Sequence, residues 1–216
     1  MGKLIDPARA KRAKRAREER AARILEAAGK AFVRDPYFEL TLDSIGRQAG
    51  VKQGQATLAF RSLEELYMTV LRGRLNEWYD ELEAQMTASE DPLAVDEMAD
   101  LVATSLTGRP DLTRMLGPLH MVLEVHEDGV QVHQFYQWQL ARLTTLADAT
   151  ARRIAGVDRW DAFDALYRSQ LVAATIHPLD RPVGNLAVDL MAEEHQVFAL
   201  DMESEIARVV RECLKA

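Results

Sequence analysis

Four polar residues within six positions have types and spacing suited to chemistry: Lys52, Gln53, Gln55 and Thr57. A carboxamide donates and accepts hydrogen bonds at once, so each glutamine matches the N6 and N7 edge of adenine. The Lys52 ammonium suits a phosphate or the O6 and N7 atoms of guanine, and Thr57 offers a hydroxyl. Gly54 leaves room for a close approach to the backbone. The cluster therefore fits a surface that reads DNA, although the same glutamines also suit exposed positions on an ordinary helix.

The basic charge of the chain is concentrated near its N-terminal end. Residues 1–75 hold 16 Lys and Arg against 9 Asp and Glu, whereas residues 76–216 hold 11 against 25, so the net charge of −7 hides two parts of opposite sign. Nine of the basic residues lie between Lys3 and Arg23. Because local positive potential sets phosphate affinity, this asymmetry favours a nucleic-acid partner. A basic arm taken alone is equally compatible with a solvated tail.

Helical periodicity predicts an all-α fold. Apolar residues recur at three- and four-residue spacing, strand-like alternation is absent, and Gly (11) and Pro (7) are sparse. The composition, 48% apolar and 28% charged, is that of a folded chain with a sizeable core. We expect a small N-terminal bundle that leads into a larger bundle through one long helix.

The polar cluster lies in a pair of short helices joined by a tight turn. Thr41 is placed to cap a helix that ends near Ala49, and Gly50 can adopt the left-handed conformation of the turn. The next helix is expected from about Gln53 to Phe60. The apolar residues expected to form the core of this pair are Ile45, Ala49, Val51, Leu58 and Phe60. Phe60 has no series of aromatic neighbours, which argues against a surface for single-stranded nucleic acid.

Two longer helices flank this pair. The preceding helix is expected to have the Arg/Lys-rich arm as its N-terminal part and an apolar stripe that begins at Ile24. It ends before Pro36 because the residue before a proline is pushed out of the α region. Ser62 and Glu65 form an S-x-x-E capping box at the start of a helix that continues to about Thr87. Further helices are expected over residues 91–107, 112–116, 119–126, 129–155, 159–176 and 186–214, with 119–155 forming either one kinked helix or two.

The N-terminal residues resemble the TetR (tetracycline-repressor-like) family of transcription regulators over about 45 ungapped positions. The matching features are Ile24–Phe32, Tyr37, Leu42–Val51, Gly54, Phe60 and the run from Ser62 to Leu66. The resemblance implies a three-helix helix-turn-helix DNA-binding domain at residues 21–66, preceded by a basic arm at residues 1–20. It also implies a larger helical ligand-binding and dimerisation domain at residues 67–216.

The chain departs from the family pattern in the third helix. That helix usually reads like SKGTLYYHF, whereas residues 52–60 read KQGQATLAF, so that Thr57 and Leu58 replace an aromatic pair. Pro36 stands where the family usually has glycine, and Leu63 where lysine is common. Several backbone contacts typical of the family are therefore missing, and the basic arm is a candidate to compensate for them.

The resemblance implies both base and phosphate contacts. In a helix-turn-helix the second helix lies in the major groove with its N-terminal side chains at the base edges, which suits Gln53 and Gln55. Thr41 lies at a helix N-terminus, where a phosphate is favoured, and Arg61 and Ser62 hold the same place in the next helix. The arm residues expected to track the DNA backbone or the minor groove include Arg12 and Arg15.

A small-molecule effector site is implied for the C-terminal part. Such a site is usually a large apolar cavity with a few polar groups. The apolar candidates are Trp78, Met115, Phe135 and Trp138, although any single such residue is more often part of a core. The polar candidates to orient a ligand are His120, Glu124, His126, Gln134 and Gln170.

The last two long helices are the expected dimerisation elements. Their interface residues are expected to be Phe163, Leu166, Tyr167, Leu171, Met191, His195 and Phe198. A two-fold dimer would read an inverted repeat, with half-sites about 34–36 Å apart or a multiple of that distance. The resemblance thus favours a repressor that a small, largely apolar ligand releases from a palindromic operator, with the long helix ending near Thr87 as the lever.

Two other classes of protein remain open. His120 and Glu124 share one helical face, as do His126 and His133, but the sequence has no H-E-x-x-H motif, P-loop or nucleophile elbow. We therefore expect neither an enzyme nor a bound metal or cofactor, with a metal sensor as a weak alternative. The other alternative is a helical ligand-binding or protein-interaction module that has lost specific DNA binding, although such a module has no need of the basic arm.

The sequence lacks the features of a membrane-spanning, secreted or disulfide-bonded protein. The apolar stretches fall short of the roughly 20 residues that cross a bilayer, and the N-terminus lacks the apolar region of a secretory signal. The single cysteine, Cys213, cannot form an intramolecular disulfide. We expect a cytoplasmic protein without a membrane partner.

Overall fold

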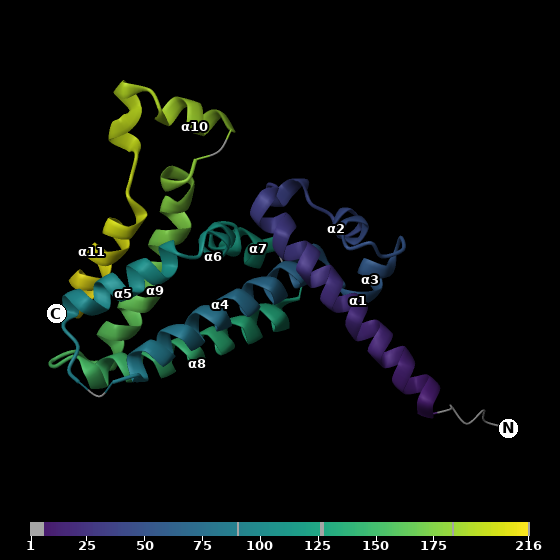
Figure 1. Ribbon diagram of the computed structural model, residues 1–216, viewed down its shortest axis with the longest axis horizontal. Helices are drawn as coiled ribbons and strands as arrows, with labels where there is room; N and C mark the ends of the chain where they lie inside the picture. The colour runs from purple at the N-terminus through teal and green to yellow at the C-terminus, as the bar shows by residue number, and fades with distance from the viewer. Residues whose placement is uncertain (1–6, 90, 126–127, 183, 216) are drawn as a thin grey trace. The chain divides into compact units, whose positions relative to one another are not determined.

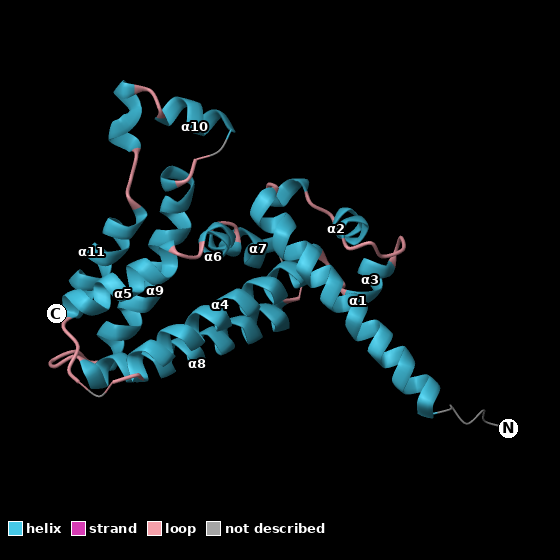
Figure 2. Ribbon diagram, in the orientation of Figure 1, coloured by secondary structure: helices cyan, strands magenta, loops and turns pink. Residues whose placement is uncertain are grey.

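The computed structural model describes residues 7–89, 91–125, 128–182 and 184–215, and along these residues every regular element is a helix (Figures 1 and 2). The all-α prediction is therefore confirmed. The chain divides into two compact units, one ending at Val70 and one beginning at Leu71. None of the described helices is long and apolar enough to cross a membrane.

The first unit consists of the N-terminal helices. Its elements are α1 (Pro7–Arg34), the 3-10 helix η1 (Tyr37–Glu39), α2 (Leu42–Gln48), α3 (Gln55–Ala59) and the first turns of α4 (Leu63–Thr87). α1 packs against both α2 and α3. Their shared core contains Ile24, Ala28, Ala31, Phe32, Ile45, Ala56, Phe60, Leu66 and Tyr67. Because helices as short as α2 and α3 are marginal alone, burial of these side chains is what holds them in place.

Three aromatic rings lock η1 against its neighbours in the first unit. The ring centroids of Phe32 and Tyr67 lie 5.0 Å apart, and those of Tyr37 and Tyr67 lie 5.3 Å apart, both in edge-to-face arrangements. The Tyr37 hydroxyl donates a hydrogen bond to Glu64 Oε1 at 3.2 Å. Burial and the nearby carboxylate raise the pKa of Tyr37, so the phenol stays neutral. The chain after α1 is therefore anchored to the start of α4.

The expected basic arm is part of α1. Helix α1 begins at Pro7, so the described residues of the arm are helical. Alanine, lysine, arginine and glutamate, which fill this segment, are all strong helix formers. Two ion pairs at four-residue spacing support the helix, Lys14–Glu18 at 3.8 Å and Arg15–Glu19 at 2.9 Å.

The second unit is a larger helical bundle. After the main part of α4 it contains α5 (Val95–Thr107), α6 (Pro110–Leu116), α7 (Leu119–Val125), α8 (Gly129–Arg153), α9 (Arg159–Asp180), α10 (Gly184–Leu190), the 3-10 helix η2 (Glu193–Phe198) and α11 (Met202–Leu214). α9 is central, because it packs against α5, α6, α8 and α11. α4 and α8 lie side by side (Figure 1), with the Tyr79 and Trp138 rings 6.1 Å apart.

Two expected helix boundaries in the second unit need correction, and one open alternative is decided. The 119–155 region, expected as one kinked helix or two, forms two helices, and Asp128 caps the second through hydrogen bonds from Val130 N and Gln131 N. α9 continues past Pro178 to Asp180. The expected single helix over 186–214 is instead α10, η2 and α11, because Asp201 accepts a hydrogen bond from Ser204 N at 3.2 Å and starts a new helix.

The start of α5 is set by contacts from α8. The expected start was residue 91, but the helix begins at Val95. Leu93 N donates to Arg153 O at 2.8 Å, and Arg153 Nε donates to Asp91 O at 2.8 Å. These bonds hold the chain before α5 outside the helix, a long-range effect that local sequence does not reveal.

Candidate functional site

The turn between α2 and α3 follows from local signals. Thr41 Oγ1 accepts a hydrogen bond from Ser44 N at 3.0 Å, and Ser44 Oγ accepts one from Thr41 N at 3.0 Å, which forms a reciprocal cap at the start of α2. Gly50 has φ 64°, the left-handed conformation predicted for the turn. Gly46 is buried where a Cβ would lie 3.2 Å from Ala56 Cβ, so this glycine allows α2 and α3 to approach closely.

Gly54 sets the start of α3 later than expected. It caps α3 with φ 75°, so the helix begins at Gln55 rather than at Gln53. A left-handed residue cannot belong to a right-handed helix, and Lys52 and Gln53 therefore lie in the turn. Both are exposed, and Gln55 is half-buried at the first helical position. The three polar side chains still lie at the N-terminal end of α3, where base contacts are made in helix-turn-helix proteins.

Two residues of α3 differ from expectation. Thr57 Oγ1 donates to Gly54 O at 2.8 Å, so in this conformation its hydroxyl proton is not offered to a phosphate oxygen. Leu58 was expected in the core, but 75% of its surface is exposed. Residues two positions apart on a helix point about 200° apart, so burial of Ala56 places Leu58 on the outer face. The expected core residues Ile45 and Phe60 are buried.

A second basic residue joins Lys52 beside the turn. Arg47, in the last turn of α2, and Lys52 are both exposed and both line a groove of about 190 Å³ in the first unit. Asp43 lines the same groove and offsets part of their charge. Sequence reasoning missed Arg47, although a basic residue in the last turn of the helix before the reader was a usable signal.

The start of α4 offers less to a phosphate than expected. Glu65 N donates to Ser62 Oγ at 3.1 Å, as the capping box predicted. The Glu65 carboxylate accepts from Arg61 N at 2.6 Å rather than from Ser62 N. A carboxylate at this helix N-terminus occupies the place of an anion. The exposed Arg61 side chain is therefore the stronger candidate for a phosphate contact here.

The helical form of α1 changes how its basic residues could meet DNA. Residues 7–34 carry ten Lys and Arg against three Glu. Arg12 and Arg15 are exposed on this helix. A helix is about 10–12 Å wide with its side chains, whereas the minor groove is only about 6 Å wide. The expectation of minor-groove tracking therefore does not suit the described part of the arm, and phosphate contacts do.

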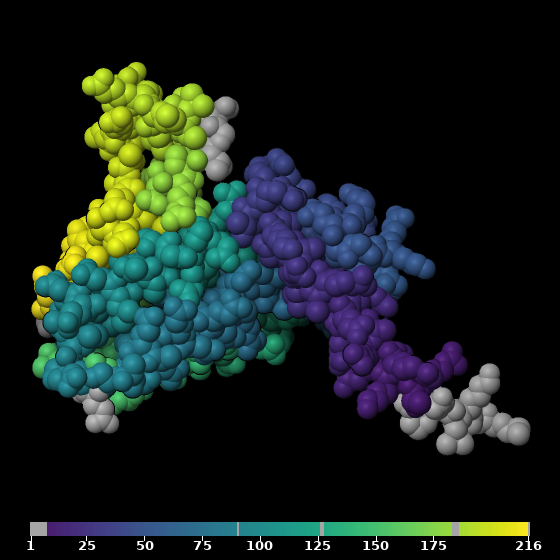
Figure 3. All heavy atoms as spheres, in the orientation of Figure 1, coloured from purple at the N-terminus to yellow at the C-terminus, as the bar shows by residue number. Residues whose placement is uncertain are grey.

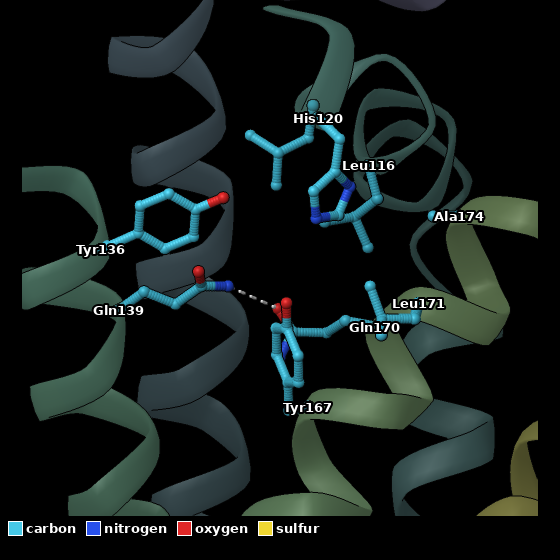
Figure 4. A pocket seen from close by; sticks show the side chains of 9 residues that line it. Leu116, His120, Tyr136, Gln139, Tyr167, Gln170, Leu171 and Ala174 are labelled. Carbon is cyan, nitrogen blue, oxygen red and sulfur yellow. Dashed lines mark hydrogen bonds between the residues drawn. The ribbon is translucent and has the colours of Figure 1, made fainter. Parts of the chain in front are cut away.

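The second unit contains a pocket between α6, α7, α8 and α9 (Figure 4). Its lining residues are Leu116, Leu119, His120, Tyr136, Gln139, Tyr167, Gln170, Leu171 and Ala174. The cavity volume is about 10 Å³, close to the minimum that holds one water molecule. The pocket is thus too small for a larger ligand in this conformation, and such a ligand must displace its walls. His120 and Tyr136 are exposed, so their side chains can turn outward without leaving the core.

A buried hydrogen-bond network forms one wall of this pocket. Tyr79 Oη donates to Gln170 Oε1 at 3.1 Å, and Gln139 Nε2 donates to the same oxygen at 3.4 Å. Gln170 Nε2 donates to Leu166 O at 3.1 Å. Burial raises the pKa of Tyr79, so the phenol remains a neutral donor. The network fixes both carboxamides in orientation inside the bundle.

Of the expected ligand residues, only His120 and Gln170 line the pocket. Trp78, Met115 and Phe135 are buried core residues, and Trp78 Nε1 donates to Ser105 Oγ at 2.9 Å. Glu124 and Gln134 are exposed and do not line the pocket. Trp138 faces the Arg72 guanidinium, whose central carbon lies 4.8 Å from its ring centroid. His126 lies outside the described residues.

Sequence reasoning missed Gln139, and it placed Tyr136 only among the aromatic residues of this region that could be core or ligand wall. Gln139 stands four residues after Phe135 and four before Leu143, and all three are buried on one face of α8. A glutamine inside such an apolar stripe was the signal that could have identified it. Gln170 holds a similar place on α9.

The expected dimerisation residues separate into three groups. Leu166 is fully buried in its own chain, which corrects its assignment to an interface. Tyr167 and Leu171 line the pocket between α6 and α9, and half-buried Phe163 contacts the Tyr167 ring at a centroid distance of 6.2 Å. The remaining three residues are Met191, His195 and Phe198.

These three residues belong to a segment that stands out from the second unit. We call residues 184–200, which comprise α10 and η2, the apolar lobe (Figure 3). Met191 is 81% exposed, and Val188, Val197 and Phe198 are also exposed. A groove of about 520 Å³ runs along the lobe, with half-buried His195 among its lining residues. Exposed apolar side chains in this number indicate a surface that another molecule covers.

A metal sensor was only a weak alternative in the sequence analysis, with His120 and Glu124 as candidate ligands. Among the described residues, no three His, Cys, Asp or Glu side chains gather in a group that could hold a metal ion. His120 instead lines the apolar pocket.

Comparison with family models matches residues 72–215, more than half of the chain, to the family described as tetracyclin repressor-like, C-terminal domain. A comparison with curated proteins found no significant match. The matched range covers almost the whole second unit.

Several solved structures share the fold at low sequence identity. The fatty acid degradation regulator FadR from Bacillus halodurans is 14% identical, with a TM-score of 0.56 over 90% of this chain and 94% of that chain. FadR from Bacillus subtilis, solved in complex with stearoyl-CoA, is 14% identical, with a TM-score of 0.58 over 89% and 98%. A putative TetR-family transcriptional regulator from Mesorhizobium loti is 14% identical, with a TM-score of 0.51 over 92% and 95%.

Proposed function

Because the chain belongs to the tetracycline-repressor-like family of ligand-responsive transcriptional regulators, we propose that it is a homodimeric repressor of a palindromic operator that a small, largely apolar ligand releases. The observation that carries this proposal is the exposed polar cluster at the start of α3, set in a strongly basic unit. The pocket in the second unit would supply the response to the ligand. We place the protein in the cytoplasm, where its operator would be, and assign it no catalytic role.

Base recognition in this proposal comes from the turn before α3. Gln53 and Gln55 would meet adenine edges in the major groove, and exposed Leu58 would contact a thymine methyl group. Arg47, Lys52 and Arg61 would hold phosphates on either side of the reading side chains. The basic face of α1 would add sequence-independent affinity.

Selection from genomic DNA tests this function. Purified protein is incubated with a genomic fragment pool, and bound fragments are sequenced for the wild type, Gln53→Ala and Gln85→Ala. Gln85 is exposed on α4 in the second unit and serves as the control. We expect a palindromic sequence to be enriched by the wild type and the control, with loss of about 1–3 kcal/mol of binding in Gln53→Ala. Enrichment that survives in Gln53→Ala would contradict the assignment of the reader.

Dimerisation would supply the two-fold symmetry that a palindrome requires. Exposed apolar residues on α9 and in the apolar lobe support a second copy as the partner. Trp160, at the start of α9, is 61% exposed, and Met191 in the lobe is 81% exposed. Coverage of these side chains by a second chain would remove apolar area from water at roughly 25 cal/mol per Å².

Ligand binding would release DNA by shifting the dimer to another conformation. The pocket holds about 10 Å³ in the closed form, so any ligand larger than water prefers an opened form. A ligand shifts such an equilibrium only by its preference for one state. FadR from Bacillus subtilis, which shares the fold, was solved with stearoyl-CoA, which supports a ligand with a long apolar part.

The alternative function is a helical ligand-binding or protein-interaction module without specific DNA binding. Two observations favour it: Thr57 donates its hydroxyl proton to Gly54 O, and Glu65 occupies the N-terminus of α4. Both remove contacts that would hold phosphates. In the selection experiment this alternative predicts a folded dimer that enriches no sequence.

A further inference from the structure

We infer that the pocket between α6 and α9 selects an uncharged ligand that presents a hydroxyl or amide N–H group on an apolar body. The inference rests on the proposed ligand response and names its chemical class. It follows from which polar groups line the pocket and which of their atoms remain available.

Cations are missing from the pocket wall. Among the described residues that line it, none is Lys or Arg, and the apolar wall comes from Leu116, Leu119 and Leu171. A carboxylate or phosphate entering this space would lose its hydration without gaining a fixed positive partner, which is costly. The His120 imidazole lines the pocket at an exposed position.

Two arginines of the second unit pack against aromatic rings outside the pocket lining. Arg142 forms an ion pair with Asp80 and lies over the Tyr79 ring, with 5.7 Å between its central carbon and the ring centroid. Arg142 Nε is buried without a hydrogen-bond partner, and Arg72 lies over the Trp138 ring. Neither arginine lines the pocket, so neither offers a fixed cation to a charged group bound there.

An acceptor atom, in contrast, is available in the pocket. Gln139 is only 5% exposed, and its Nε2 donates to Gln170 Oε1, so its own oxygen points away from Gln170 (Figure 4). A carboxamide oxygen in this position favours a ligand that donates a hydrogen bond.

The tyrosines of the pocket add neutral partners rather than charge. Tyr136 and Tyr167 both line it, and burial raises the pKa of Tyr167, so its phenol keeps its proton at neutral pH. A phenol can donate to the ligand oxygen while a carboxamide accepts the ligand proton. A hydroxyl or primary amide satisfies both partners at once.

Matched pairs of ligands test the inference on the full-length protein without DNA. The pairs are 1-decanol with decanoate, and 2-naphthalenemethanol with 2-naphthoate, and binding is measured by calorimetry at neutral pH. We expect at least one neutral member to bind about tenfold more tightly than its carboxylate partner, because the carboxylate is buried without a cation. The inference is overturned if no neutral member binds more tightly than its partner. DNA binding is scored separately, so this result does not depend on the regulator function.

Substitution of one acceptor checks the residue assignment. Gln139→Leu removes the carboxamide oxygen, and Gln137→Leu, at an exposed site on the same helix, is the control. We expect the preference for the alcohol over the carboxylate to fall about tenfold in Gln139→Leu alone, the scale of one lost hydrogen bond. An unchanged preference in a folded Gln139→Leu variant would refute the role of this oxygen. The wild-type ratio remains a test if that variant does not fold.

Discussion

At the scale of single residues, buried polar groups in the second unit are held by specific partners. His177 on α9 lies 2.8 Å from Thr113 on α6, measured between Nδ1 and Oγ1, and both side chains are buried. Burial lowers the pKa of His177, and the charges of Arg114 and Arg181 lower it further, while Asp180 opposes them. This histidine therefore joins two helices as a neutral group.

The lowered pKa of His177 makes stability depend on pH. Above its ordinary pKa of about 6.5, both folded and unfolded chains hold it neutral and its full contribution is present. As the pH falls below that value, the unfolded chain binds a proton that the folded chain resists, so the free energy of unfolding falls. Urea unfolding monitored by tryptophan fluorescence reports the second unit, which contains all three tryptophans.

Replacement of the histidine isolates this effect. We expect His177→Gln to lose part of the decline in unfolding free energy between neutral and mildly acidic pH. His133→Gln, at an exposed site on α8, should keep the wild-type decline. Equal pH dependence in wild type and His177→Gln would show that another group is responsible.

At the scale of elements, strong local signals predicted the fold well. The all-α class, the Thr41 cap, the Gly50 turn and the end of α1 before Pro36 all follow from side-chain chemistry at one or two positions. Elements set by distant contacts were not predictable in this way. The start of α5 depends on Arg153, which lies far along the chain.

The polar cluster at α3 could be predicted from the sequence more fully than the pocket of the second unit. The polar cluster at the start of α3 could be proposed from the sequence, because its residue types suit DNA contacts wherever the helix begins, and its role in DNA binding stays a prediction. The pocket was found only through His120 and Gln170, because aromatic residues such as Trp78 look alike in a core and in a ligand wall. Gln139 shows that a polar residue within a buried stripe is the better signal.

Substitution of Pro178 would test how far tertiary contacts maintain α9 against the low helix propensity of proline. A proline inside a helix costs about 3 kcal/mol, yet α9 continues through it between buried His177 and Asp180. We expect Pro178→Ala to raise the free energy of unfolding of the second unit by up to about 3 kcal/mol. Pro182→Ala, outside the helix, is the control. No gain in urea unfolding would mean that the Ala174 carbonyl already has an equivalent partner.

At the scale of the whole molecule, the N-terminal part is basic, whereas the C-terminal part is acidic and has exposed apolar surface. Residues 1–75 carry a net charge of +7 and residues 76–216 a net charge of −14. In the proposed function, DNA would attract the first part and repel the second, which would direct binding to the N-terminal helices. The apolar lobe is the surface that we propose for contact with a second copy of the chain.

Substitution in the apolar lobe should disrupt the dimer. We expect the wild type to sediment as a dimer and Met191→Glu with Phe198→Glu to sediment as a monomer, because carboxylates would be buried in the interface. Val130→Glu, at an exposed site at the start of α8, should remain dimeric. A dimer that tolerates the double substitution would place the interface elsewhere, and a monomeric wild type would remove the basis for a palindrome.

The central claim is that a basic α1 supplies phosphate contacts while the turn before α3 supplies sequence recognition. Its most direct test is the affinity for the enriched operator and for unrelated DNA, each measured over a range of salt concentrations. Neutralising Arg9, Lys11 and Arg12 with glutamine should weaken binding to both DNAs and reduce the salt slope by about 0.9 per lost phosphate contact. Gln53→Ala should weaken binding to the operator alone. Salt-independent binding, or equal loss on both DNAs in Gln53→Ala, would contradict the claim.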